Sequence, residues 1–218
     1  MIISSFLIVV FIFLAGLYVG TFFDSSRIVD VNEILIKAQM DTDSLVTEND
    51  FFNTFAVTDC NLLNNRMNYL GERLGEIGRT LSRYDAKNMM SKQEYDILKE
   101  KYFLLELKVY NLKKRTSDLC TADIQPTVLF FYNTKNNQES LNQGYALDSI
   151  VKNNKEISIF SFDVDFNNSA VRSLIFYYNV TSIPTIVVNF NDKHEGFISE
   201  REINAFILNS KNVVVNKK

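Results

Sequence analysis

Residues 178–185 read Tyr-Asn-Val-Thr-Ser-Ile-Pro-Thr and run directly into Ile-Val-Val-Asn-Phe at 186–190. The second part is apolar and rich in β-branched residues, which is typical of a strand. Pro184 stands just before this run, and Pro126 is the only other proline in the chain. The sequence therefore predicts a loop that ends at Pro184 and a strand over 185–190.

The segments on either side of this loop alternate between strand and helix patterns. In chain order, the predicted elements are a strand at 127–132, a helix at 141–152, a strand at 157–166, a helix at 170–178, the strand at 185–190, a short strand around 196–198 and a last helix at 199–208. Ser199 and Glu202 form a capping box at the start of that last helix. An α/β domain is predicted over residues 122–210, followed by a tail at 211–218.

The loop at 178–185, preceded by a helix and by Asp163 and Asp165, resembles the signature of the thioredoxin superfamily. This resemblance covers about residues 126–208. It implies a cis peptide bond before Pro184, and a role for Pro184 and the Ile183 backbone in holding an extended peptide. More loosely, the whole layout resembles membrane-bound thioredoxin-like proteins of archaea.

The chain departs from the family at the redox centre. Family enzymes carry a Cys-x-x-Cys motif after the first core strand, at the start of a helix that favours the reactive thiolate. Residues 132–139 read Tyr-Asn-Thr-Lys-Asn-Asn-Gln-Glu and contain no cysteine. Dithiol chemistry at this place is therefore excluded. The predicted peptide-groove residues are Ile183, Pro184, Thr134, Lys135, Asn136 and Asn137.

The first 23 residues predict a single transmembrane anchor. From Ile2 to Phe23 no residue is charged, and a helix of this length can span the roughly 30 Å hydrocarbon layer. A cleaved signal peptide is the alternative, but there is no basic segment before the apolar run and the run is too long. Residues 24–50 predict a juxtamembrane helical stalk, amphipathic over 27–40 and broken at 41–43.

The region 51–121 predicts an antiparallel helical hairpin. Apolar residues recur at alternating spacings of four and three from Leu63 to Tyr84, and again from Tyr95 to Leu112. Ser91 and Glu94 form a capping box that starts the second helix.

The two cysteines, Cys60 and Cys120, flank this hairpin, each thirty residues from Met90 near the turn. Folding at the turn brings them to the same end, where a structural disulfide is predicted. Two separate buried thiols are the alternative if the domain faces a reducing compartment. Gly71, Gly75 and Gly78 mark either a flat packing surface or a strained helix.

Two features favour an extracytoplasmic location for the bulk of the chain, as a single-pass protein of the cell membrane. One is the predicted disulfide, and the other is a pair of glycosylation sequons at Asn167 and Asn179. The charges flanking the anchor do not decide its orientation.

The sequence contains no motif for metal binding or for cofactor binding. The single histidine, His194, is expected in an exposed turn, and no metal site or cofactor is predicted. Asp163 and Asp165 are expected to end a strand and cap the next helix, and Asn167 and Asn168 are further candidates for that cap. A net charge of −3 with interspersed signs does not indicate a nucleic-acid-binding stripe, and no nucleic-acid partner is predicted.

The sequence therefore leads to two hypotheses of different classes. The first is a membrane-tethered, non-catalytic thioredoxin-like module that binds or scaffolds extended peptide or protein partners. The second is a thiol-disulfide oxidoreductase that uses Cys60 and Cys120 or a partner's thiols. A third, structural interpretation has the hairpin assembling a homo-oligomer.

Overall fold

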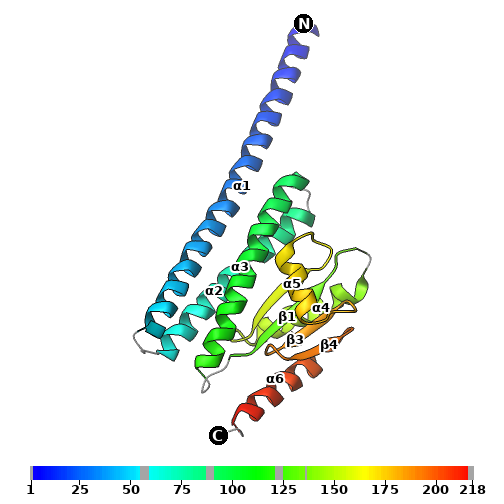
Figure 1. The fold of residues 1–218 in the computed structure, drawn as a ribbon. Coiled ribbons are helices and arrows are strands. Elements are labelled where there is room, and N and C mark those ends of the chain that lie inside the picture. Colours follow the sequence, from blue (N-terminus) through cyan, green and yellow to red (C-terminus); the bar gives the residue numbers. More distant parts are fainter. Residues whose placement is uncertain (1, 55–58, 87–90, 121–124, 136, 216–218) are drawn as a thin grey trace.

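The computed structural model describes residues 2–54, 59–86, 91–120, 125–135 and 137–215. Its elements are α1 (Ile2–Thr54), α2 (Cys60–Ala86), α3 (Lys92–Leu119), β1 (Thr127–Tyr132), α4 (Gln138–Asn153), β2 (Ser158–Asp163), α5 (Ser169–Tyr177), β3 (Thr185–Val188), β4 (Asp192–Glu195) and α6 (Glu200–Val215). Figure 1 shows the long helices α1, α2 and α3 side by side, with the sheet packed beside α3.

The strands form one mixed sheet in the order β2-β1-β3-β4. β1 and β2 are parallel, whereas β3 runs antiparallel to both β1 and β4. Side chains of a strand alternate between the two faces, so Leu129 and Phe131 pack towards α3 and α5, while Val128 and Phe130 pack towards α4 and α6. This arrangement is compatible with the thioredoxin-like fold that the sequence predicts.

The predicted hairpin is confirmed, and α1 joins it to make a three-helix bundle. The side chains of Leu35, Ala38 and Leu45 are buried in the same core as those of α2 and α3. Polar contacts fix the alignment: Lys101 Nζ donates to Asn32 Oδ1 at 2.8 Å, and Arg66 pairs with Glu48 at 2.7 Å.

The predicted break at residues 41–43 is wrong, because α1 continues through it. Thr42 Oγ1 donates to the Ala38 carbonyl at 2.7 Å, and its side chain is fully buried in the bundle. The polar sequence at this point therefore satisfies its hydrogen bonds within the helix. The stalk is part of the bundle and does not stand apart from it.

The apolar side chains that the structure describes near the start of α1 are exposed. They are Phe6, Ile8, Val9, Val10, Phe11, Ile12, Phe13, Leu14, Leu17, Tyr18 and Val19. Over the described residues, however, no helix combines the length and the apolarity needed to cross a membrane. The predicted transmembrane helix is therefore not supported by the structure.

The hairpin is closed as predicted. A disulfide joins Cys60, the first residue of α2, to Cys120, the residue that ends α3, and no cysteine is left free. The Ser91–Glu94 capping box is present at the start of α3.

Of the three glycines of α2, Gly78 is the one that permits close packing. A Cβ at Gly78 would lie 2.6 Å from the Tyr102 hydroxyl oxygen, and one at Gly71 would lie 3.5 Å from Ser158 Oγ in the sheet. A Cβ at Gly75 would meet only the side chain of Arg79, on its own helix. Assembly of several chains through this helix stays a prediction.

Helix α3 lies along β2, which is an edge strand of the sheet. Three polar side chains spaced seven residues apart make the contact. Lys99 pairs with Asp163 at 2.7 Å, Glu106 accepts from the Ser161 backbone N–H at 3.1 Å, and Lys113 donates to Ser158 Oγ at 2.7 Å. The helix thereby covers an edge that could otherwise pair with another strand.

The C-terminal elements differ in detail from the prediction. The last hairpin strand is β4 at Asp192–Glu195, and not 196–198, because Gly196 has a φ of +83° that ends the strand. Helix α6 begins with the predicted Ser199–Glu202 capping box and extends to Val215, into the predicted tail.

Candidate functional site

The loop between α5 and β3 carries the residues that the sequence points to. The Ile183–Pro184 peptide bond is cis, as the resemblance implies. Pro184 is buried, and its carbonyl accepts from the Gly196 N–H at 2.7 Å. Ile183 is half-buried, and none of the described residues accepts a hydrogen bond from its backbone N–H. This backbone donor is available to a ligand.

The start of α4 lies against this loop. Asn137 is the N-cap of α4, and its Oδ1 accepts from the Ser140 N–H at 2.9 Å. The other end of the same side chain reaches the loop, because Nδ2 donates to the Ile183 carbonyl at 3.2 Å. One residue therefore links the helix terminus to the cis-proline loop.

Ser140 completes the turn below Asn137. Its side chain is 4% exposed, and its Oγ accepts from the Asn133 N–H at 3.4 Å. Asn137 and Ser140 have the spacing of a Cys-x-x-Cys motif and stand at the start of the helix after β1, where the resemblance places that motif. Neither side chain holds sulfur, so no disulfide can form here.

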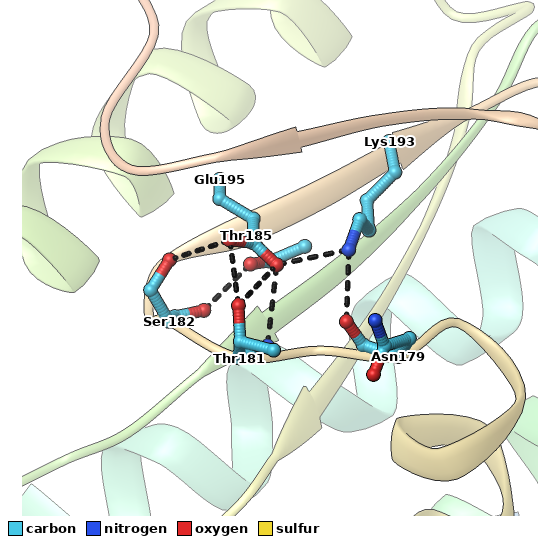
Figure 2. A network of polar contacts seen from close by, with 6 residues as sticks. All are labelled: Asn179, Thr181, Ser182, Thr185, Lys193 and Glu195. Carbon is cyan, nitrogen blue, oxygen red and sulfur yellow. Dashed lines mark hydrogen bonds and ion pairs between the residues drawn. The ribbon is translucent and has the colours of Figure 1, made fainter.

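A polar network holds the other side of the loop to β4 (Figure 2). The Glu195 carboxylate accepts from the Thr181 N–H at 3.2 Å, from Thr181 Oγ1 at 2.8 Å and from Ser182 Oγ at 3.2 Å. Lys193 Nζ lies 2.9 Å from the same carboxylate and also donates to the Asn179 carbonyl at 2.8 Å.

This network keeps Glu195 charged. Its pKa is lowered to about 2, first by the hydrogen bond from Lys193 and then by those from Thr181. Thr185 Oγ1 adds a bond to the Ser182 carbonyl at 2.6 Å. The loop is thus fixed by several bonds that do not involve α4.

The start of the loop is attached to the bundle. The hydroxyls of Tyr178 and Tyr110, a buried residue of α3, share a hydrogen bond. Burial is the main cause that raises the pKa of both hydroxyls, so both stay protonated. The helical bundle therefore supports the loop directly.

The structure brings together three of the predicted groove residues, Ile183, Pro184 and Asn137. Thr134 and Lys135 lie exposed on the turn between β1 and α4, and Asn136 lies outside the described residues. Sequence reasoning missed Ser140, Thr181 and Glu195. An Asn followed three residues later by Ser, at a helix start, was the signal for Ser140. The Glu195 contacts depend on strand register, which the sequence did not fix.

The predicted roles of two other residues are revised. Asp163 ends β2 as expected, accepts from the Asp165 N–H at 3.0 Å and pairs with Lys99. It does not cap α5, whose N-cap is Asn168, one of the two asparagines predicted for that role. His194 is not in an exposed turn: it lies in β4, half-buried, with its ring stacked on Phe206 at a centroid distance of 3.9 Å. No group of metal-binding side chains occurs among the described residues.

The disulfide lies away from this surface. The surface is at the carboxyl ends of β1 and β2, where Lys99 of α3 meets Asp163. Cys120 is at the opposite end of α3, about 30 Å further along the helix at 1.5 Å per residue.

Comparisons with solved structures give matches that cover less than half of this chain. The sequence matches no protein-family model and no curated protein. A malarial protein and the malaria parasite's thioredoxin-2, described as a component of protein secretion machinery, are each 28% identical over 39% of this chain, with TM-scores of 0.34; the matches cover 96% and 82% of those chains. Chloroplastic thioredoxin z is 18% identical over 44% of this chain and 87% of its own, with a TM-score of 0.35.

Proposed function

We propose that this chain is a non-catalytic, thioredoxin-like binding module that holds an extended peptide segment of a partner protein between the cis-proline loop and the start of α4. The observation that carries the proposal is the backbone N–H of Ile183, which has no acceptor among the described residues on a loop that is otherwise firmly held.

A free backbone donor beside a sheet favours recognition of main chain over side chain. In β-augmentation, an extended peptide adds backbone hydrogen bonds, and the neighbouring side chains supply specificity. Thr181 and Ser182 are exposed on the loop, and Lys135 is exposed on the turn before α4. These three polar side chains would line the path of such a peptide.

The absence of sulfur from the start of α4 argues against the oxidoreductase alternative. That alternative would have to use Cys60 and Cys120, which are bonded to each other at the far end of α3. A structural role is favoured for this disulfide, because it joins the start of α2 to the end of α3. It also fits the predicted extracytoplasmic location.

Attachment to a membrane is part of the proposal. Support comes from the first turns of α1, where the large apolar side chains that the structure describes from Phe6 to Val19 are exposed around the helix. A helix that is apolar on every side is usually buried, in a protein core or in lipid. Figure 1 shows this part of α1 extending beyond the other elements, with no protein around it.

Site-specific photocrosslinking tests the proposal. A photoreactive residue replaces Lys135 at the site, and in a matched variant it replaces Lys155, an exposed lysine beyond the other end of α4. In native membranes, the probe at 135 should capture partner segments and the probe at 155 should not. Equal capture from both positions, or none from 135, would refute the proposed site.

An insulin-reduction assay addresses the lack of catalysis separately. The purified chain should show no reductase activity above a variant with both Cys60 and Cys120 changed to Ser. Activity that depends on these cysteines would restore the oxidoreductase hypothesis.

A further inference from the structure

The two backbone groups of Ile183 are not equally available. Two residues that lie directly opposite each other in antiparallel strands can form two hydrogen bonds. In each bond, the N–H of one residue donates to the carbonyl of the other. The Ile183 N–H is free to do this, but the Ile183 carbonyl already accepts from Asn137 Nδ2 at 3.2 Å. That bond also joins the start of α4 to the loop, the two segments between which we propose that the peptide binds.

We propose that Asn137 controls the affinity of this site: its side-chain amide occupies the Ile183 carbonyl, and a peptide must displace it to pair with both backbone groups of Ile183. This inference rests on the proposed function. It adds a specific residue that sets the strength of binding, and it describes the ligand as main chain in an extended conformation.

The contact is suited to displacement. Asn137 is half-exposed, so its amide can exchange this bond for one to water or to the peptide. The opposite end of its side chain, Oδ1, makes the shorter bond of the pair, at 2.9 Å to the Ser140 N–H. The helix cap and the contact with the loop are therefore made by different atoms.

The loop does not depend on Asn137 for its position. Glu195 holds Thr181 and Ser182, and Thr185 holds the Ser182 carbonyl (Figure 2). Pro184 is fixed by the bond from Gly196 at 2.7 Å. Removing the Asn137 amide should consequently free an acceptor without releasing the loop.

The test compares two serine substitutions. Asn137→Ser keeps an N-cap oxygen, since Ser and Asn cap helices about equally well, but its side chain is too short to reach Ile183. Asn168→Ser is the matched control. Asn168 caps α5 by accepting from Ala170 N–H at 2.8 Å, and its Nδ2 donates to Glu100 at 3.2 Å. Each variant loses one amide contact of equal length.

Binding is measured with a displayed library of random twelve-residue peptides, selected on the full wild-type chain purified in detergent. A hydrogen bond contributes a net factor of about 2 to 12 in binding. The selected peptides should bind N137S more tightly by about this factor, while their affinity for N168S stays within about twofold of wild type. The gain should be smallest for peptides that do not adopt an extended conformation.

Two results would overturn the inference. One is equal or weaker binding of wild-type-selected peptides to N137S while N168S is unchanged. The other is faster hydrogen exchange at the Thr181 amide in unliganded N137S together with weaker binding, since the amide would then position the loop. If neither the wild type nor N137S selects any peptide, the proposed function itself fails, which is a separate outcome.

Discussion

Glu106 is a buried carboxyl group at the contact between α3 and β2. Its side chain is 1% exposed, and one of its two oxygens has no hydrogen-bond partner among the described residues. The pKa of Glu106 is raised from 4.5 to about 8, and burial is the largest cause. Hydrogen bonds from the Ser161 N–H and from Tyr102 lower the pKa by smaller amounts. The side chain is therefore mostly protonated at neutral pH.

This residue should make stability depend on pH. Between pH 4.5 and 8 the folded state keeps a proton that the unfolded state has lost, so the free energy of unfolding falls as the pH rises through this window. Glu106→Gln removes that proton uptake. We expect E106Q and wild type to be similar near pH 4.5, and E106Q to be more stable near pH 8 by a few kcal/mol, on the order of 1.4 kcal/mol for each pKa unit.

Urea unfolding at several pH values measures this difference. Lys113, on the same face of α3, serves as an internal reference. Its burial lowers its pKa to about 8 from 10.5, so its effect lies above pH 8, outside the window. Parallel stability profiles for E106Q and wild type between pH 4.5 and 8 would contradict the account.

At the scale of elements, alanine substitutions at two glycines in helix interiors should change the stability in opposite directions. A Cβ at Gly78 would lie 2.6 Å from the Tyr102 hydroxyl, whereas a Cβ at Gly144 of α4 meets nothing within 4 Å. Gly144→Ala should stabilise the protein by up to about 1 kcal/mol through helix propensity. Gly78→Ala should destabilise it by about 1–3 kcal/mol, because the buried Tyr102 side chain or one of the two helices must shift.

Thermal unfolding of the two variants decides between close packing and simple helix strain. Stabilisation by both substitutions would mean that Gly78 is a weak point of α2 and not a packing contact.

The disulfide should contribute to the stability of the helical hairpin. The bond links residues 60 apart in sequence, and closing a loop of this size should contribute about 4 kcal/mol by restricting the unfolded chain. Changing both cysteines to Ser should lower the free energy of unfolding by about this amount, without abolishing the folded state. The denaturant midpoint of reduced wild type should match that of the double variant. Unchanged midpoints would show that helix packing alone holds the start of α2 and the end of α3 together.

Local patterns in the sequence predicted several features correctly. The capping box of α3 and the pairing of Cys60 with Cys120 follow from a short motif and a clear periodicity. The cis bond before Pro184 was implied by the resemblance to the thioredoxin superfamily. Polar residues that are buried by tertiary contacts were not predictable in this way. Lys99, Glu106 and Lys113 fit a solvated helix face, and only the docking of α3 on β2 explains their burial.

The candidate site was predicted only in part for the same reason. Ile183 and Pro184 follow from the loop motif. The sequence, however, did not determine at which residue α4 begins, so Ser140 was not included. Thr181 and Glu195 meet because β3 and β4 pair Thr185 with Glu195. No pattern within either segment reveals that register.

At the scale of the whole molecule, the bundle connects the candidate site to the apolar end of α1. Asn32 of α1 meets Lys101 of α3, and two residues away Lys99 meets Asp163 at the carboxyl end of β2. Figure 1 shows α6 on the opposite side of the molecule from the start of α1. If α1 enters a membrane, the site faces that membrane.

Membrane attachment can be tested with paired lysine substitutions in α1. Phe11 and Ile12 are 73% and 64% exposed in the apolar stretch, and Ile36 and Met40 are 45% and 68% exposed beside the bundle. Replacing the first pair with Lys should release the chain from membranes at neutral pH, because charge in the hydrocarbon layer is costly. Replacing the second pair should leave it in the membrane fraction. Release of the wild type, or retention of the first variant, would contradict attachment through α1.

The account depends above all on peptide binding at Ile183, and hydrogen exchange at that amide is the most direct measurement. The full chain is compared with and without a peptide taken from the displayed library. We expect the bound peptide to slow exchange at Ile183, because its free N–H gains an acceptor, while the Thr181 amide, already bonded to Glu195, changes little. Binding that leaves the Ile183 amide unprotected and slows exchange elsewhere would contradict the proposed site.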